Sequence, residues 1–151
     1  MIKVNNLYIA SDHAGFKLKA FILTNYNNYN EKIFDLGAPN DLSSFDYPDF
    51  AFLMANKIKN LNDYGILICG SGVGISIAAN RFSHIRAALC YDIQSTKLSR
   101  QHNDANILSL GGRKINFNLA LKCVETFLST KFEGGRHNKR IEKLSKPITI
   151  K

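Results

Sequence analysis

The sequence predicts a three-layer α/β domain in which helices cover both faces of a doubly wound, five-stranded parallel sheet. Short apolar segments alternate with amphipathic segments along the chain, which is the pattern of strand–helix–strand units. One apolar segment, Gly65–Cys69 (GILIC), is continuous, as expected of a strand buried on both faces. Polar or glycine-rich residues follow the first and third predicted strands, where the ligand crevice of such a sheet opens.

The first half of the chain contains three predicted strands and two predicted helices. The first helix places Phe16, Ala20 and Leu23 on one face, which we expect to be buried. Pro48 stands where a second helix can begin, because proline is tolerated in a first helical turn. In chain order, the predicted elements are strand 7–10, helix 16–26, strand 32–36, helix 50–59 and strand 65–69.

The second half continues the alternation after a turn at residues 70–74. Gly111 and Gly112 end the last strand, and Pro147 stops the last helix. The predicted elements are helix 75–82, strand 86–90, helix 93–101, strand 106–110, helix 117–128 and helix 136–145. Together the two halves predict one domain over residues 1–151, of the Rossmann-like or flavodoxin-like kind.

Length and composition agree with a globular protein. A chain of 151 residues fits one domain, and its content of 45% hydrophobic and 21% charged residues excludes a disordered chain. Neither an apolar run of bilayer length nor a secretory signal is present, so we expect a soluble, cytoplasmic protein without a membrane partner. The three cysteines lack a CxxC pair, which predicts neither a disulfide framework nor a zinc knuckle.

The positive charge is concentrated at the end of the sequence. Residues 113–151 hold 10 basic and 3 acidic groups, a net charge of +7 within the chain's total of +8. Such a patch attracts nucleic acid, acidic lipid or a phosphorylated metabolite. Nucleic acid is disfavoured, because Phe132 is the only aromatic residue after Phe127. Arg113, Arg136 and Arg140 are candidates to hold a phosphate, although a solvated helix face remains an alternative for Arg140.

The segment Cys69–Gly74 carries glycines at positions 70, 72 and 74, between a buried strand and a helix start. Such a loop can turn tightly and direct backbone N–H groups toward an anion. The spacing matches neither the dinucleotide fingerprint nor a Walker loop, and Ser71 is not in a nucleophile elbow. A tight turn without a ligand is the alternative.

Cys69 strengthens the case for a catalytic loop. At the end of a strand and facing a helix start, its sulfur lies in a positive potential that favours the thiolate, which can act as nucleophile or base. The alternative is a small buried apolar residue. We expect that alternative for Cys90 and Cys123, which lie within apolar segments.

The histidines fall on different edges of the predicted sheet. Asp12 and His13 follow the first strand and face Cys69–Gly74, whereas His102 and Asn103 precede the fifth strand, at the opposite edge. If His102 is catalytic, it serves the crevice of a neighbouring subunit; the alternative is a helix C-terminal cap. No two histidines have ligand spacing such as H-x-x-x-H, so we expect no metal site.

Several stretches resemble the ribose-5-phosphate isomerase type B family, which also contains galactose-6-phosphate isomerase subunits. They extend from the first strand to the last helix, and the block around Cys69 is the most specific of them. The stretches are SDHAGF (11–16), DYP (46–48), GILICGSGVGISIAAN (65–80), LSRQHN (98–103) and EGGRH (133–137).

The resemblance implies interconversion of D-ribose 5-phosphate and D-ribulose 5-phosphate through a cis-enediolate, without metal or organic cofactor. It makes Cys69 the base, because Ile75 stands where some members carry a glutamate. The other implied roles are oxyanion binding by the amides of Gly70–Gly74, proton transfer by Ser71, ring opening by His102 assisted by Asp12, enediolate binding by Asn103, and phosphate binding by His13, Arg113, Arg136 and Arg140.

Two alternatives remain open at this point. The His102–Asn103 pair, together with Arg136–His137, favours a pentose over galactose 6-phosphate, but an isomerase of allose 6-phosphate or another six-carbon sugar phosphate is not excluded. A non-catalytic phosphate-binding module would need the glycine loop and would have no use for Cys69 or His102. The sequence predicts at least a homodimer, since the two edges must meet in one site.

Overall fold

The computed structural model describes residues 2–27 and 32–146. All five predicted strands are present, and every pair of neighbouring strands is parallel, in the order β2-β1-β3-β5-β4. The strands are β1 (Asn6–Ser11), β2 (Lys32–Asp35), β3 (Asp63–Cys69), β4 (Ala87–Leu89) and β5 (Ile107–Gly111). The predicted doubly wound sheet is therefore confirmed.

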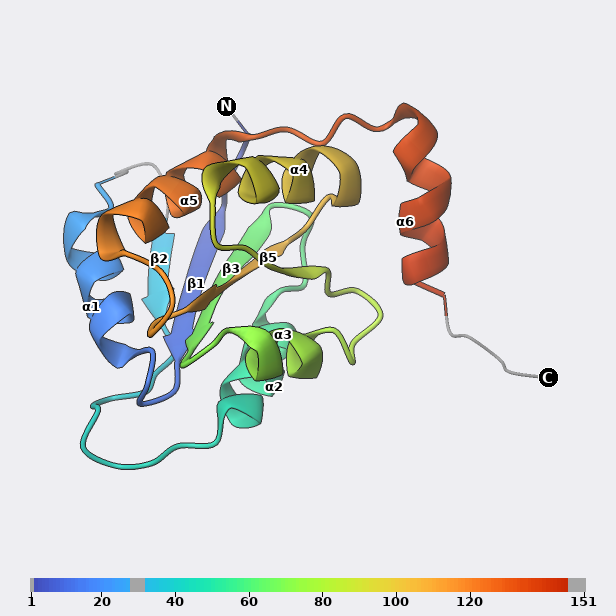
Figure 1. Ribbon diagram of the computed structural model, residues 1–151. Coiled ribbons are helices and arrows are strands. Elements are labelled where there is room, and N and C mark those ends of the chain that lie inside the picture. The colour runs from blue at the N-terminus through green and yellow to red at the C-terminus, as the bar shows by residue number, and fades with distance from the viewer. Residues whose placement is uncertain (1, 28–31, 147–151) are drawn as a thin grey trace.

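Helices cover the sheet on both sides, with α1, α4 and α5 on one face and α2 and α3 on the other (Figure 1). This arrangement confirms the three-layer class. The helices are α1 (Phe16–Asn25), α2 (Tyr47–Lys57), α3 (Val73–Ala79), α4 (Ile93–Asn103), α5 (Phe117–Ser129) and α6 (Asn138–Leu144), with a 3₁₀ turn η1 (Gly135–His137) before the last. Among the described residues no helix is both long and apolar enough to cross a membrane.

The core lies on both faces of β3, all seven residues of which are buried. Ile66 and Ile68 pack in the cluster that contains residues of α1 and α5, whereas Leu67 and Cys69 pack in the cluster beneath α2 and α3. Successive side chains of a strand alternate between the two faces, and a continuous apolar run supplies both. Cys69 is thus held at the end of the most buried strand.

The buried face of α1 differs from the predicted one. Ala20 is exposed, and the helix instead buries Leu18, Lys19 and Ile22. Lys19 can lie in the core because its ammonium group is paired: Nζ lies 2.6 Å from a carboxylate oxygen of Asp35 and donates to a backbone carbonyl. A pattern of apolar residues alone assigns the wrong face when a lysine is one of the buried residues.

The end of the chain also differs from prediction, because residues 136–145 do not form a single helix. The turn η1 comes first and α6 follows it directly. The turn begins at Gly135, and both Gly134 and Gly135 have a positive φ, of 65° and 56°. No residue of α6 is buried, and the helix stands away from the sheet (Figure 1). It carries Leu144, whose exposed fraction is 58%.

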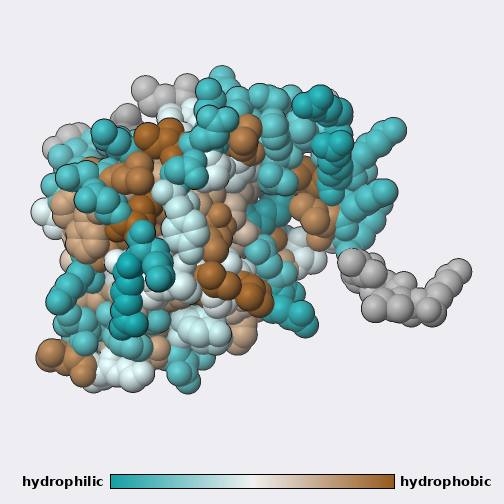
Figure 2. All heavy atoms as spheres, viewed as in Figure 1, coloured by the Kyte–Doolittle hydropathy of each residue, from teal (hydrophilic) through white to brown (hydrophobic). Residues whose placement is uncertain are grey.

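Apolar side chains are also exposed on α3 and at the start of α4. Ile77 of α3 is 61% exposed, and Val73 and Ile93 are exposed by more than two fifths. Figure 2 shows apolar surface interrupted by hydrophilic residues on the face viewed there.

Candidate active site

The loops after β1, β3 and β5 are bound together at the carboxyl edge of the sheet. The backbone N–H of Asp12 donates to the carbonyl of Ile68 at 3.1 Å. On the other side of β3, the N–H of Gly112 donates to the carbonyl of Cys69 at 2.8 Å, and that of Arg113 to Gly70 at 3.1 Å. Because β1, β3 and β5 are adjacent, residues from three distant parts of the sequence meet here, as predicted for Asp12 and the Cys69 loop.

The sulfur of Cys69 accepts a hydrogen bond from the backbone of its own loop. Gly72 donates through its N–H to Sγ at 3.1 Å. Gly72 has a φ of 80°, which turns the chain back toward the sulfur. A Cβ at this position would lie 2.5 Å from Leu89 Cδ1 and 2.8 Å from a backbone carbon of Leu110. Only glycine therefore fits this turn, which brings its own amide to the sulfur.

The other two cysteines are in different surroundings. Cys90 and Cys123 lie in the core cluster that includes residues of α1 and α5. Burial raises the pKa of both thiols, and this effect exceeds the opposing one of neighbouring hydroxyl groups such as that of Thr96. Both remain neutral thiols in the physiological range, in agreement with the expectation that they serve as small apolar residues.

Two of the loop amides have partners other than the expected oxyanion. The N–H of Gly72 is engaged with Cys69, and the N–H of Val73 donates to Ser71 Oγ at 3.3 Å. The Ser71 carbonyl accepts from the hydroxyl of Tyr91 at 2.6 Å. In this structure the Gly72 amide contacts the sulfur of Cys69. Oxyanion binding by the amides of Gly70–Gly74 stays a prediction.

Asp12 and His13 are fixed by backbone groups. Asp12, which is 6% exposed, accepts through Oδ1 from the N–H of Gly15 at 3.0 Å. His13 accepts through Nδ1 from the N–H of Phe45 at 3.1 Å. A ring nitrogen that accepts carries no proton, so the proton of the neutral imidazole lies on Nε2, which is left as a donor.

Arg113 extends over the same loop. Its Nη1 lies 3.5 Å from the position that a Cβ at Gly70 would occupy. Tyr47 borders the loop from α2, since its ring lies 2.5 Å from the equivalent position at Gly74. Neither Tyr47 nor Tyr91 was among the candidate residues. The DYP stretch was the one signal that could have indicated Tyr47.

His102 and Asn103 lie at the other edge of the sheet, as the topology predicts. The segment that follows them meets the amino end of β3, where Gly65 donates to the carbonyl of Asn106 at 2.9 Å. A strand of seven residues spans about 20 Å, so the two edges are this far apart. The helix closes at Asp104, which has a φ of 45°, so that residue and not His102 forms the cap.

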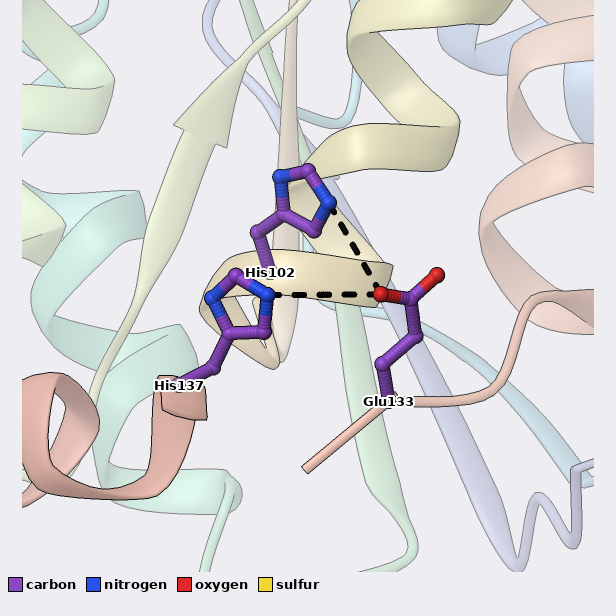
Figure 3. Close-up of side chains that lie close together, drawn as sticks. All are labelled: His102, Glu133 and His137. Carbon is purple, nitrogen blue, oxygen red and sulfur yellow. Dashed lines mark ion pairs between the residues drawn. The ribbon is translucent and has the colours of Figure 1, made fainter. Parts of the chain in front are cut away.

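The side chain of His102 stacks on His137, with ring centroids 4.5 Å apart and an interplanar angle of 12°. Glu133 lies beside both rings: its Oε2 is 3.8 Å from His102 Nε2 and 4.0 Å from His137 Nε2 (Figure 3). Arg136 Nε donates to His137 Nε2 at 3.4 Å. Glu133 and His137 were not candidate site residues: Glu133 entered only as part of the EGGRH stretch, and His137 as part of that stretch and of the pair that favours a pentose.

The electrostatic surroundings of this cluster are positive. Desolvation lowers the pKa of His137, and charge interactions with His102, Arg136 and Arg140 lower it further, against an opposing effect of Glu133. Arg136 and Arg140 are themselves exposed. They lie in η1 and α6, at the same edge as His102 and away from Arg113.

Two cavities lie toward the amino edge of the sheet, away from Cys69, with volumes of about 370 and 310 Å³. The first is lined by Arg86, Arg100 and Asp104, and the second by Asn103 and Leu144. Neither is lined by any residue of Cys69–Gly74. The loop that carries Cys69 and the cavities next to the His102 edge are separate features of one chain.

Comparison with known proteins places the chain in a family. The family model described as Ribose/Galactose Isomerase matches residues 7–144. The chain is 46% identical over 140 residues to a probable ribose-5-phosphate isomerase B of Mycoplasma pneumoniae, covering 91% of each. It is 43% identical over 135 residues to the ribose-5-phosphate isomerase B of Escherichia coli, covering 89% of this chain and 90% of the relative.

Solved structures of similar proteins have the same fold. Ribose 5-phosphate isomerase B from Anaplasma phagocytophilum superposes with a TM-score of 0.90 at 42% identity, over 95% of this chain and 99% of that one. The Mycoplasma genitalium enzyme, solved with bound ribulose-5-phosphate, gives a TM-score of 0.89 at 42% identity, over 95% and 96% of the two chains.

Proposed function

Because the chain belongs to the ribose/galactose isomerase family, we propose that it interconverts D-ribose 5-phosphate and D-ribulose 5-phosphate with Cys69 as the base. The isomerase activity follows from relatives that match it over nearly their whole length, one of them solved with ribulose-5-phosphate. The observation that carries the role of Cys69 is the hydrogen bond from Gly72 to its sulfur, in a loop joined to those of Asp12 and Arg113.

The chemistry needs one base that moves a proton between adjacent carbons. The Cys69 thiolate removes the proton from C2 of the open-chain aldose, the electron pair forms the C1–C2 double bond, and negative charge develops on O1. The same thiol returns the proton to C1 to give the ketose, while Ser71 transfers a proton between the two oxygens. Ile75, fully buried beside the loop, has no group that can replace the thiolate.

The phosphate is held by fixed donors at the carboxyl edge. His13 offers an Nε2 proton because its Nδ1 accepts from Phe45. Arg113 offers a planar guanidinium group that can bond two phosphate oxygens at once. Gly70 and Gly74 present backbone amides between these groups and the sulfur. The dianionic end of the substrate thereby places its C1 and C2 atoms near Cys69.

The remaining site residues come from a second copy of the chain. His102, Asn103, Arg136 and Arg140 lie about 20 Å from the sulfur within one chain, which no side chain can span. A homodimer or larger homo-oligomer brings the amino edge of one copy over the crevice of the other. The exposed Ile77 and Leu144, and the absence of a buried residue in α6, support an interface at these surfaces.

In this arrangement His102 opens the furanose ring as a general acid with Asp12 at the ring hydroxyl groups, and Asn103 binds the enediolate. The reaction needs no metal and no organic cofactor, because a side chain of the protein carries out each proton transfer. We place the enzyme in the cytoplasm, as one domain over residues 1–151, without a nucleic-acid or membrane partner.

The test is a coupled assay on chelator-treated protein with ribose 5-phosphate, galactose 6-phosphate and allose 6-phosphate. We expect the highest kcat/KM with ribose 5-phosphate. A higher value with a six-carbon sugar phosphate would favour the hexose alternative. Binding of ribose 5-phosphate without turnover would favour a non-catalytic phosphate-binding module.

A further inference from the structure

The cluster of His102, Glu133 and His137 has the composition of a metal site. Within residues 2–27 and 32–146, these three side chains are the one group of at least three potential ligands close enough to share an ion. His102 comes from the last turn of α4, and the other two come from the segment around η1 (Figure 3). The close-up shows Glu133 to one side of the two rings, with one carboxylate oxygen facing a nitrogen of each.

The distances allow one ion to contact all three residues. Two pairs of ligand atoms are 3.8 and 4.0 Å apart, and no pair is separated by more than 4.8 Å. A point about 2.5 Å from each of the three ligand atoms therefore exists, whereas Zn²⁺ makes bonds of about 2.0–2.2 Å with nitrogen and oxygen. Each ligand atom would have to move by about 0.4 Å to reach these bond lengths.

The side chains have the freedom that ligation requires. A stacked pair of rings must turn so that both Nε2 lone pairs point at one ion, and the side chain of His102 is 36% exposed and can turn. His137 is buried, so the ring of His102 makes most of this rotation. Arg136, which donates to His137 Nε2, is exposed and can withdraw.

The ligand set selects the class of ion. Two imidazoles and one carboxylate form the set that binds Zn²⁺ in many enzymes, with a fourth position left to water. Mg²⁺ and Ca²⁺ prefer sets of oxygen atoms and do not suit it. The Glu133 carboxylate offsets part of the positive charge of Arg136 and Arg140, which repel a cation.

The alternative is a purely structural role, in which the cluster ties the segment around η1 to α4. The backbone supports such a tie, since the N–H of Glu133 donates to the carbonyl of Gln101 at 3.0 Å. That bond does not need the side chain of Glu133 and does not bring its Oε2 to both rings. A structural tie and a metal site therefore predict different behaviour in the presence of metal.

We propose that His102, Glu133 and His137 bind a divalent transition metal of the Zn²⁺ class, and that the bound ion inhibits the isomerase by occupying His102. Binding stands on the geometry of the cluster alone. Inhibition rests on the proposed function, because only there does His102 act on substrate. The ion is a reversible inhibitor in this proposal and takes no part in the isomerisation.

The binding arm of the test uses the full chain, freed of metal by chelator and dialysis, and carrying Cys69→Ser so that its thiol cannot compete. Zn²⁺ is titrated by calorimetry, and Co²⁺ is added as a probe whose visible absorption reports tetrahedral coordination. We expect one site per chain. Glu133→Gln and His137→Asn should each weaken binding by at least about tenfold, as loss of a ligand does.

The matched control is His84→Asn, because His84 is an exposed histidine that contacts Ala55 and lies outside the cluster. We expect it to leave Zn²⁺ affinity unchanged. Circular dichroism and the melting temperature without metal establish that each variant is folded. Unchanged Zn²⁺ affinity in folded Glu133→Gln and His137→Asn, or no binding to the parent chain, would overturn the metal site and leave the proposed function standing.

The activity arm uses the chain with Cys69 intact. Zn²⁺ should inhibit isomerisation of ribose 5-phosphate, chelator should restore the rate, and Glu133→Gln should raise the half-inhibiting concentration by about tenfold. Binding at the cluster without inhibition would overturn the inhibitory part of the proposal. That outcome would count against the assignment of His102 in the reaction, while the metal site itself would remain.

Discussion

The carboxyl and amino edges of the sheet hold their functional residues in different ways. At the carboxyl edge, Asp12 and the Cys69 loop are fixed by backbone hydrogen bonds between three adjacent strands. At the amino edge, His102 is held mainly by the side chains of Glu133 and His137, next to an α6 helix that buries nothing. The difference indicates that the edge with Cys69 is preorganised within one chain, whereas the proposed function requires the other edge to act together with a second copy.

The largest effect should come from the base at the preorganised edge. Cys69→Ala removes the proposed base, and we expect kcat to fall by about 10³-fold or more. Binding of ribose 5-phosphate, measured by calorimetry, should persist because the phosphate ligands are unchanged.

Cys123→Ala is the matched control, since it removes a thiol from the core, away from the loop. It should cost about 1–2 kcal/mol of folding free energy and leave kcat nearly unchanged. An equal loss of turnover in the two variants would refute the assignment of the base to Cys69.

A smaller loss of activity should follow from a change at the amino edge. His102→Asn removes the proposed acid for ring opening while the base remains, and we expect kcat to fall by about 10²-fold. The control His84→Asn should retain wild-type kinetics, since that histidine contacts Ala55 and lies outside the cluster of His102, Glu133 and His137. Full activity of His102→Asn would mean that the amino edge takes no part in the reaction.

The two edges should also differ in their tolerance of a methyl group at a left-handed glycine. Gly72→Ala meets Leu89 and the backbone of Leu110, and we expect a loss of about 2–3 kcal/mol in the free energy of unfolding. Gly135→Ala has the same backbone strain but no atom within 4 Å of the added Cβ, and should cost about 1 kcal/mol. Urea denaturation measures both; a larger loss for Gly135→Ala would contradict the difference in rigidity.

The smallest effect concerns Asp63, which anchors the amino end of β3. Its burial acts to raise its pKa, but hydrogen bonds from Asn6, Asn60 and the N–H of Lys59 outweigh burial and keep the pKa below the ordinary value. A lowered folded-state pKa gives stability that is present above the unfolded value of about 3.9 and is lost as the pH falls through the folded value.

Asp63→Asn should therefore cost about 1 kcal/mol at neutral pH, and the cost should shrink as the pH approaches 3. Urea denaturation of both proteins at several pH values measures the difference. A cost that is the same at every pH would show that the carboxylate charge contributes nothing.

The residues of the carboxyl edge could be predicted from the sequence because local patterns mark them. A buried apolar strand followed by alternating glycines placed Cys69 at a strand end, and chain alternation placed Asp12 beside it. The hydrogen bond from Gly72 to the sulfur could not be predicted, because it depends on the dihedral angles of the loop.

The amino edge was less predictable, because its contacts join segments about 30 residues apart. Ligand spacing within one helix finds pairs such as H-x-x-x-H but cannot find His102 with Glu133 and His137. The burial of Lys19 could not be predicted for a related reason. Its partner Asp35 lies on another element, and a lysine without a visible partner is expected at the surface. Contacts between segments far apart in the sequence can be identified only once the tertiary fold is known.

The most direct measurement mixes two inactive variants. Cys69→Ala and His102→Asn chains, co-expressed or refolded together, form mixed dimers in which one site combines an intact Cys69 with an intact His102 of the other copy. Random pairing should restore about a quarter of wild-type activity. If the mixture stays as inactive as the separate variants, Cys69 and His102 do not meet across a subunit boundary, and the account of a site built from two edges is wrong.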